Sequence, residues 1–162
     1  MNERLTTASQ RLCELLISKG KTITTAESCT GGLVASSLTS VSGASACFEY
    51  GFVTYSNSAK QNLLCVNQTT LKTHSAISSN TALEMAQGAL KVSGADVALA
   101  VTGNAGPNAS EGKEVGLIYV SVMSKDGKSV CRQLNLKGDR DANRKEAAAI
   151  LVEMAIEYIQ ST

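Results

Sequence analysis

The segment from Asp96 to Thr102, DVALAVT, constrains the fold most because it is almost continuously apolar. A strand with one face in water alternates apolar and polar residues, whereas a strand buried on both faces is apolar throughout. The run is far shorter than a membrane-spanning helix requires. It therefore predicts a buried strand in a sheet that helices cover on both sides.

Helical and strand-like patterns alternate along the rest of the chain. Apolar residues at helical spacing predict helices over residues 3–18, 56–64, 78–92 and 139–159, and another after Gly32. Thr81 and Glu84 have the spacing of a capping box in the helix over 78–92. Strands are predicted over residues 21–26, 48–55, 96–102, 115–123 and 130–136, the last two joined by a hairpin turn. The expected fold class is α/β, a three-layer α/β/α sandwich on a mixed sheet, in a single domain over residues 1–162.

The composition excludes several classes of function. A net charge of +1 gives no basic surface for nucleic acid or a membrane, so a small molecule is the expected partner. The chain has five cysteines but no C-x-x-C pair, which argues against a disulfide framework or a zinc site. No residues have metal-ligand spacing, and free thiols are typical of the reducing cytoplasm, where we expect the protein to be located.

The segment 26–32, AESCTGG, lies between a predicted strand and a predicted helix. Ligands of α/β sheets bind at the carboxyl ends of strands, where free backbone N–H groups also stabilise a developing oxyanion. Ser28 is therefore a candidate nucleophile, although an ordinary helix cap is equally compatible with the spacing. Cys29 competes with it, because a thiol at a helix N-terminus has a lowered pKa, but cysteine is also common in protein cores.

A serine nucleophile needs a base, and two candidates are open. His74 is the only histidine, and it lies in a polar segment that predicts a solvated loop. Lys60 follows a predicted strand together with Tyr55, so both can reach the sheet edge that carries Ser28. A lysine acts as a base only when burial lowers its pKa, and by residue type alone a solvated lysine is the commoner case.

Two further segments suggest an anion site. The loop 102–107, TGNAGP, follows the buried strand and is rich in backbone donors. Arg140 and Arg144 open the last helix and are suited to a phosphate, although surface arginines are equally common there. The segment 106–113, GPNASEGK, is not a nucleotide-binding P-loop, because five residues separate its glycines and Glu114 follows its lysine.

These motifs together resemble one protein family. The sequence contains, in order, AESCTGG at 26–32, Y-S-N at 55–57 with Lys60, T-G-x-A-G-P at 102–107, V-G at 115–116 and G-D-R at 138–140. They resemble the CinA C-terminal-domain family, the stand-alone bacterial nicotinamide-nucleotide amidohydrolases. The resemblance covers nearly the whole chain.

The resemblance implies a function and a set of site residues. Members hydrolyse the carboxamide of nicotinamide mononucleotide (NMN) to nicotinate mononucleotide and ammonia in pyridine-nucleotide salvage, without a metal or other cofactor, and usually form homo-oligomers. By this resemblance Ser28 is the nucleophile, with Lys60 as its base and Tyr55 as a polar partner. The substrate-binding residues implied are Thr30, Gly31, Gly32, Thr102, Gly103, Ala105, Gly106, Arg140 and Arg144.

The chain departs from the family pattern in one loop. Asn104 stands where a small apolar residue is usual, and the segment 108–114, NASEGKE, replaces a run of glycines and a proline and is one residue short. Glycines allow a ligand to approach the backbone closely, and Glu111 and Glu114 add negative charge near the expected phosphate site. A second hypothesis is therefore a catalytically silent paralogue that binds a nucleotide-like ligand or a protein partner.

Overall fold

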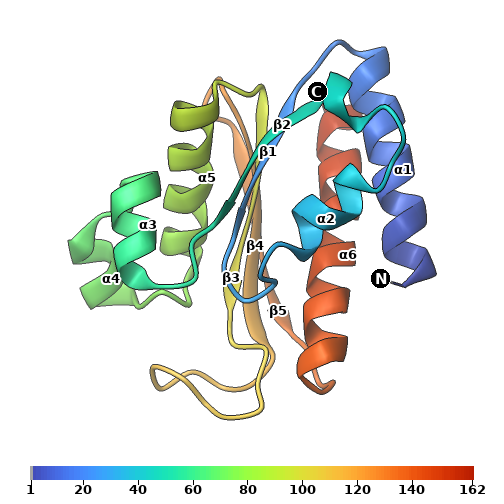
Figure 1. Cartoon of the computed structure of the whole chain (residues 1–162). Coiled ribbons are helices and arrows are strands. Elements are labelled where there is room, and N and C mark those ends of the chain that lie inside the picture. The colour runs from blue at the N-terminus through green and yellow to red at the C-terminus, as the bar shows by residue number, and fades with distance from the viewer. Residues whose placement is uncertain (1) are drawn as a thin grey trace.

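The computed structural model describes residues 2–162 and has a five-stranded mixed sheet between two layers of helices (Figure 1). The strand order is β2-β1-β3-β4-β5, in which β1 pairs in parallel with β2 and β3, and β4 pairs antiparallel with β3 and β5. The strands are β1 (Ile23–Glu27), β2 (Phe48–Val53), β3 (Val97–Gly103), β4 (Leu117–Ser124) and β5 (Ser129–Asn135). The predicted α/β sandwich on a mixed sheet is confirmed.

Helices cover the two faces of the sheet unequally (Figure 1). The larger apolar cluster lies between the sheet and α1, α2 and α6, and the smaller one lies between the sheet and the other three helices. The helices are α1 (Glu3–Ser18), α2 (Leu33–Thr39), α3 (Asn57–Leu64), α4 (Gln68–His74), α5 (Ser79–Ser93) and α6 (Arg140–Ser161), with a short 3₁₀ helix at Ala44–Ala46. None of these helices is both long and apolar enough to cross a membrane.

The central strand β3 is buried on both faces, as its composition predicts. Val97, Leu99 and Val101 point into the larger cluster, whereas Ala98 and Ala100 point into the smaller one. The alternation of large and small side chains lets α5 pack closely against one face of the sheet. The carboxyl ends of β1 and β3 therefore lie side by side at one edge, because the two strands are parallel neighbours.

One helix was not predicted, and one predicted cap is wrong. Helix α4 is seven residues of mostly polar sequence with a single buried side chain, Leu71, so it has no apolar periodicity to detect. Glu84 does not form a capping box with Thr81. Its carboxylate accepts hydrogen bonds from Asn67 N at 2.7 Å and from the Thr70 hydroxyl, and thereby ties α4 to α5.

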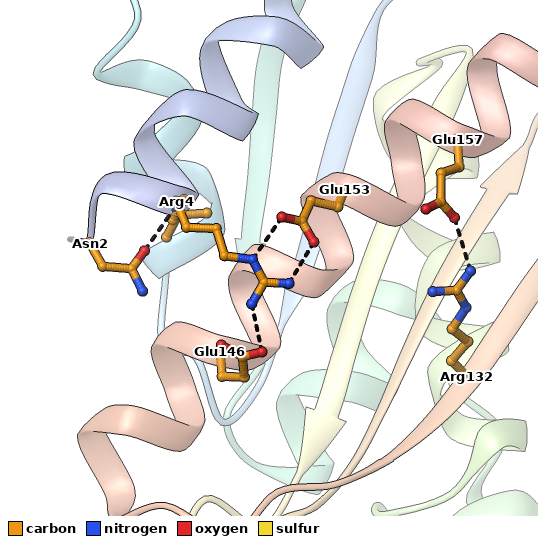
Figure 2. Close-up of polar contacts among 7 residues, drawn as sticks. Asn2, Arg4, Arg132, Glu146, Glu153 and Glu157 are labelled. Atoms are coloured by element: carbon orange, nitrogen blue, oxygen red, sulfur yellow. Dashed lines mark hydrogen bonds and ion pairs between the residues drawn. The ribbon is translucent and has the colours of Figure 1, made fainter.

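Exposed ion pairs connect α6 to its neighbours (Figure 2). Arg4 of α1 donates to both carboxylate oxygens of Glu153 and to Glu146, and Arg132 of β5 donates to Glu157. Exposed pairs of this kind stabilise a fold by up to about 1 kcal/mol each. The buried apolar contacts therefore determine the position of α6, whose first turn reaches the site described next.

Candidate active site

A cavity of about 390 Å³ opens at the carboxyl ends of β1 and β3. Its walls come from the end of β1, the segment between β2 and α3, the segment before α5, the loop after β3 and the start of α6. This loop extends past the edge of the sheet (Figure 1). The lining residues that carry polar side chains are Ser28, Cys29, Tyr55, Asn57, Lys60, Thr102, Asn104, Asn108, Ser110, Glu111 and Arg140.

Lys60 and Ser28 form a buried pair in this cavity. The Lys60 Nζ donates a hydrogen bond to the Ser28 Oγ at 3.1 Å and another to the Thr54 carbonyl at 2.8 Å. The position of Lys60 follows from its place in the first turn of α3, which the Ser56 hydroxyl caps. Only 1% of Lys60 is exposed, and burial lowers the pKa of its amine to about 8. A neutral amine is therefore accessible near neutral pH and can accept the Ser28 proton.

The competing candidates have less suitable surroundings. Cys29 is buried, and burial raises the pKa of its thiol to about 12, so the reactive thiolate is disfavoured. His74 is exposed at the end of α4 and does not line the cavity. The geometry therefore supports Ser28 with Lys60 over a cysteine nucleophile or a histidine base.

Glu27, which sequence reasoning did not single out, organises the turn around Ser28. Its buried carboxylate accepts four hydrogen bonds, from the Thr30 hydroxyl at 2.6 Å and from the N–H groups of Gly32, Val34 and Ala35 at 3.2, 3.0 and 2.8 Å. Helix α2 has no side-chain cap of its own at Gly32, so Glu27 satisfies its free N–H groups. An acidic residue at the end of a buried strand and just before a helix was the available signal.

The predicted residues Thr30, Gly31 and Gly32 build this turn and do not line the cavity. Thr30 is fully buried on Glu27. Gly31 and Gly32 have φ angles of 60° and 97°, a conformation that strains residues with a side chain. The backbone conformation of the turn therefore explains why glycine stands at both positions.

The two arginines of α6 lie in different places. Arg140 lines the cavity, where it donates to the Gly106 carbonyl at 2.6 Å and to the Tyr55 hydroxyl at 3.1 Å. Arg144 is not part of the cavity wall and instead donates to the backbone carbonyls of the Ser28 turn. Of the two, Arg140 is the one with access to a ligand in the cavity.

Tyr55 contributes to the site through two different atoms. Its hydroxyl pairs with Arg140, whereas its backbone carbonyl lies 3.5 Å from the Lys60 Nζ. The residue is 63% exposed, so the ring lies at the mouth of the cavity. The structure therefore places the Tyr55 hydroxyl near the Arg140 guanidinium and not beside the Ser28–Lys60 pair.

The four predicted residues at the start of the loop after β3 all line the cavity, and some have a second role. The Thr102 hydroxyl donates to the Ala76 carbonyl at 2.7 Å and so holds the segment before α5. A Cβ atom at Gly103 would lie 2.6 Å from the Ile118 Cα, so packing against β4 requires this glycine. The four are Thr102, Gly103, Ala105 and Gly106.

Asn104 gives the loop 104–116 a side-chain scaffold. Its amide donates to the carbonyls of Asn108 and Lys113 at 3.0 and 3.2 Å, and its Oδ1 accepts from Gly106 N at 3.0 Å. Asn104 is itself buried. Asn104, where the resemblance leads us to expect a small apolar residue, therefore holds this loop together.

Glu111 brings a negative charge to the cavity wall. Its carboxylate accepts a hydrogen bond from Ala76 N at 3.0 Å, and its charge acts to raise the pKa of Lys60 against the effect of burial. The cavity wall therefore carries the Glu111 carboxylate together with two basic side chains, Arg140 and the titratable Lys60. Within residues 2–162 no group of three His, Cys, Asp or Glu side chains is arranged to hold a metal ion.

Comparison with known proteins assigns the chain to one class, the CinA C-terminal domain, whose sequence profile matches residues 5–160. The chain belongs to the CinA C-terminal domain family. It is 43% identical over 156 residues to the nicotinamide-nucleotide amidohydrolase PncC of Escherichia coli K12, with 95% of this chain and 94% of that protein covered. It is also 43% identical to PncC of Enterobacter agglomerans, with 98% of both chains covered.

Solved structures of the same superfamily have the same fold. A CinA superfamily protein from Klebsiella pneumoniae superposes with a TM-score of 0.95 at 33% identity, over 100% of both chains. The competence/damage inducible protein CihA of Agrobacterium tumefaciens gives a TM-score of 0.94 at 38% identity, over 97% of this chain and 96% of that one.

Proposed function

We propose that this protein hydrolyses the carboxamide of NMN to nicotinate mononucleotide and ammonia, with Ser28 as nucleophile and Lys60 as base. One observation carries the proposal: the buried Lys60 amine lies 3.1 Å from the Ser28 Oγ and has a pKa lowered to about 8. The 43% identity to nicotinamide-nucleotide amidohydrolases supports the choice of substrate. In this proposal the protein acts in pyridine-nucleotide salvage and needs no cofactor.

The reaction proceeds through an acyl-enzyme. Ser28 Oγ attacks the carboxamide carbon while neutral Lys60 takes the hydroxyl proton, and backbone N–H groups stabilise the resulting oxyanion. The C–N bond then breaks, and protonated Lys60 gives its proton to the leaving nitrogen, which departs as ammonia. A water molecule attacks the Ser28 ester, Lys60 takes its proton, and Ser28 leaves as the free hydroxyl when Lys60 returns that proton.

The charges of the cavity suit this substrate. NMN carries an anionic phosphate and a cationic pyridinium ring, and the cavity wall offers Arg140 and Glu111. Arginine binds phosphate through its planar fork of donors, and Arg140 is held in place by Tyr55 and Gly106. In our proposal Arg140 binds the phosphate and the loop 102–107 lines the substrate.

The test is ammonia release from NMN, with nicotinamide as the substrate that lacks ribose phosphate. Wild-type protein is expected to release ammonia from NMN and far less from nicotinamide. Ser28→Ala and Lys60→Ala are each expected to lower kcat by roughly 10³-fold or more, as for other removed nucleophiles and bases. His74→Ala is the matched control and should retain full activity, because His74 lies outside the cavity. Unchanged activity in Ser28→Ala would disprove the mechanism.

The second candidate function is a silent binding protein. The observation that favours it is Glu111, whose carboxylate faces a cavity expected to take a phosphate. Calorimetry that shows NMN binding to a folded wild type without ammonia release would support this alternative and exclude hydrolysis. Gain of activity on replacing residues 108–114 with a glycine-rich segment would identify the loop as the cause.

A further inference from the structure

Arg144, which is distant in sequence, donates hydrogen bonds to the backbone of the turn that contains Ser28. Its Nε donates to the Cys29 carbonyl at 3.1 Å and its terminal nitrogen donates to the Thr30 carbonyl at 2.8 Å. The planar guanidinium thus engages two successive carbonyls with a geometry that a single ammonium group cannot reproduce. Because Arg144 does not line the cavity, contact with the substrate does not explain its position.

Some backbone N–H groups of the same turn donate hydrogen bonds and others do not. Ser28 N donates to the Val101 carbonyl and Gly31 N donates to the Ser28 carbonyl, both at 3.0 Å. The N–H groups of Cys29 and Thr30, between them, donate no hydrogen bond within residues 2–162. A free N–H in a buried turn is costly, and at an active site it is commonly kept for a ligand atom.

The Cys29 N–H is well placed to receive such an atom. Cys29 lines the cavity beside Ser28, so it borders the space in which an oxygen of a substrate attacked by Ser28 would lie. An oxygen of the substrate becomes negative when Ser28 attacks, and donors fixed in advance around it stabilise the transition state. This N–H belongs to the peptide that also carries the Ser28 carbonyl. A planar peptide points its C=O and N–H to opposite sides, so the direction of the Cys29 N–H depends on how the Ser28 carbonyl is held.

The carbonyls of the turn are all held, which fixes that direction. The Gly31 N–H holds the Ser28 carbonyl, and this N–H shares its peptide with the Thr30 carbonyl, to which Arg144 donates. Arg144 also holds the Cys29 carbonyl, in the peptide between these two. Glu27 holds the following N–H groups at the start of α2. Arg144 is thus the only side chain among residues 2–162 that bonds the Cys29 carbonyl, and Glu27 does not replace it.

We propose that Arg144 is a positioning residue: by holding the Thr30 carbonyl it keeps the Gly31 N–H on the Ser28 carbonyl, so that the Cys29 N–H binds the oxyanion formed on attack by Ser28. The proposal rests on the proposed function of Ser28 as the nucleophile. The proposal gives different roles to two arginines on successive turns of α6. Arg140 binds the substrate, and Arg144 orients the N–H group that stabilises the transition state.

The test compares Arg144→Gln, Arg144→Lys and Arg140→Gln in full-length protein. We expect Arg144→Gln to lower kcat by roughly 10–100-fold, somewhat less than deletion of an oxyanion donor, with KM changed by less than about threefold. Arg144→Lys should fall between wild type and Arg144→Gln, because an ammonium can hold one carbonyl. Arg140→Gln should mainly raise KM. The midpoint of the kcat/KM–pH profile should stay the same in Arg144→Gln, because Lys60 is untouched.

Several results would overturn the proposal. A normal kcat in Arg144→Gln, a rise in KM alone, or a moved pH midpoint would each assign Arg144 another role. If Arg144→Gln does not fold, as judged by circular dichroism, folded Arg144→Lys must still show the loss in kcat.

A second substrate separates this proposal from the proposed function. If wild type releases no ammonia from NMN, the burst of p-nitrophenolate from p-nitrophenyl acetate, absent in Ser28→Ala, measures acyl transfer to Ser28. A smaller burst rate in Arg144→Gln would then support the positioning role while the NMN activity fails. An unchanged burst rate, or no Ser28-dependent burst in wild type, would overturn the positioning role as well.

Discussion

The two segments that follow the parallel strands β1 and β3 meet at one cavity, yet they are held in place in different ways. The turn after β1 is mostly buried, and Glu27 and Arg144 bind its backbone from both sides. The loop after β3 is exposed from residue 107 to 112, and one of its own residues, Asn104, supports it.

This difference makes substitution costly in one segment and tolerable in the other. A substitution in the buried turn would leave carboxylate, guanidinium or N–H groups without partners, each at a cost of about 1–3 kcal/mol. The exposed loop meets no such penalty, because water satisfies its free backbone groups. The turn carries the proposed chemistry, and the loop shapes the wall against which the substrate lies. Changes in the turn should therefore affect kcat, and changes in the loop should affect KM.

The largest expected effect comes from Lys60→Met, which keeps the length of the side chain and removes the base. We expect kcat to fall by roughly 10³-fold, measured as ammonia release from NMN. The free energy of unfolding at pH 7 should not fall, because a buried amine whose pKa drops from 10.5 to about 8 costs about 3 kcal/mol in its charged form.

The pH dependence of stability checks the same residue. The folded state releases the Lys60 proton near pH 8 and the unfolded state near 10.5, so wild-type stability should rise with pH between these values. Urea denaturation at pH 7, 8, 9 and 10 should show that rise in wild type and a smaller one in Lys60→Met. Identical slopes in the two proteins would contradict a buried lysine with a lowered pKa.

A smaller effect is expected from Asn104→Ala in the exposed loop. The change removes three hydrogen bonds within the loop, so KM for NMN should rise by roughly 5–10-fold while kcat changes by less than about twofold. Gln10→Ala removes an exposed hydrogen bond on α1 and should leave both constants unchanged. A fall in kcat with unchanged KM would show that the loop takes part in the chemistry, against the division proposed here.

The fold was predictable from sequence because its strongest signals are local. The apolar run of β3 requires burial on both faces, and the D-G turn at 125–128 places β4 beside β5. Helix α4 was not predictable, because Leu71 is its only buried residue and its contacts with α5 depend on Glu84, which is distant in sequence.

The candidate site was only partly predictable. Ser28 lies on a recognisable strand-to-helix turn, but residue type alone favours a solvated Lys60, and only the fold brings its amine to the Thr54 carbonyl and Ser28. Arg144 is separated by more than a hundred positions in the sequence from Cys29 and Thr30, whose carbonyls it binds, so no local pattern reveals these contacts. Residue type alone makes both arginines candidates for a phosphate, whereas the tertiary structure distinguishes Arg140, which lines the cavity, from Arg144, which holds a backbone.

The smallest expected effect tests whether the loop also acts on the base through its charge. The kcat/KM for NMN should rise with pH, with a midpoint near the Lys60 pKa of about 8, because only the neutral amine accepts a proton. Glu111 favours the charged amine, so Glu111→Gln should move the midpoint down by about half a unit and raise kcat/KM at pH 7 relative to its plateau by about threefold.

Glu114→Gln is the matched control for this shift, because Glu114 is an exposed carboxylate of the same loop that does not line the cavity. Its midpoint should equal that of wild type. An equal shift in both variants would indicate a general effect of net charge, and an unchanged or raised midpoint in Glu111→Gln would mean that Glu111 does not raise the pKa of Lys60. A downward shift confined to Glu111→Gln would sharpen the comparison between the two segments. The loop would then shape the substrate wall and also adjust the pKa of Lys60, so substitutions in the loop would change the pH dependence of activity as well as KM.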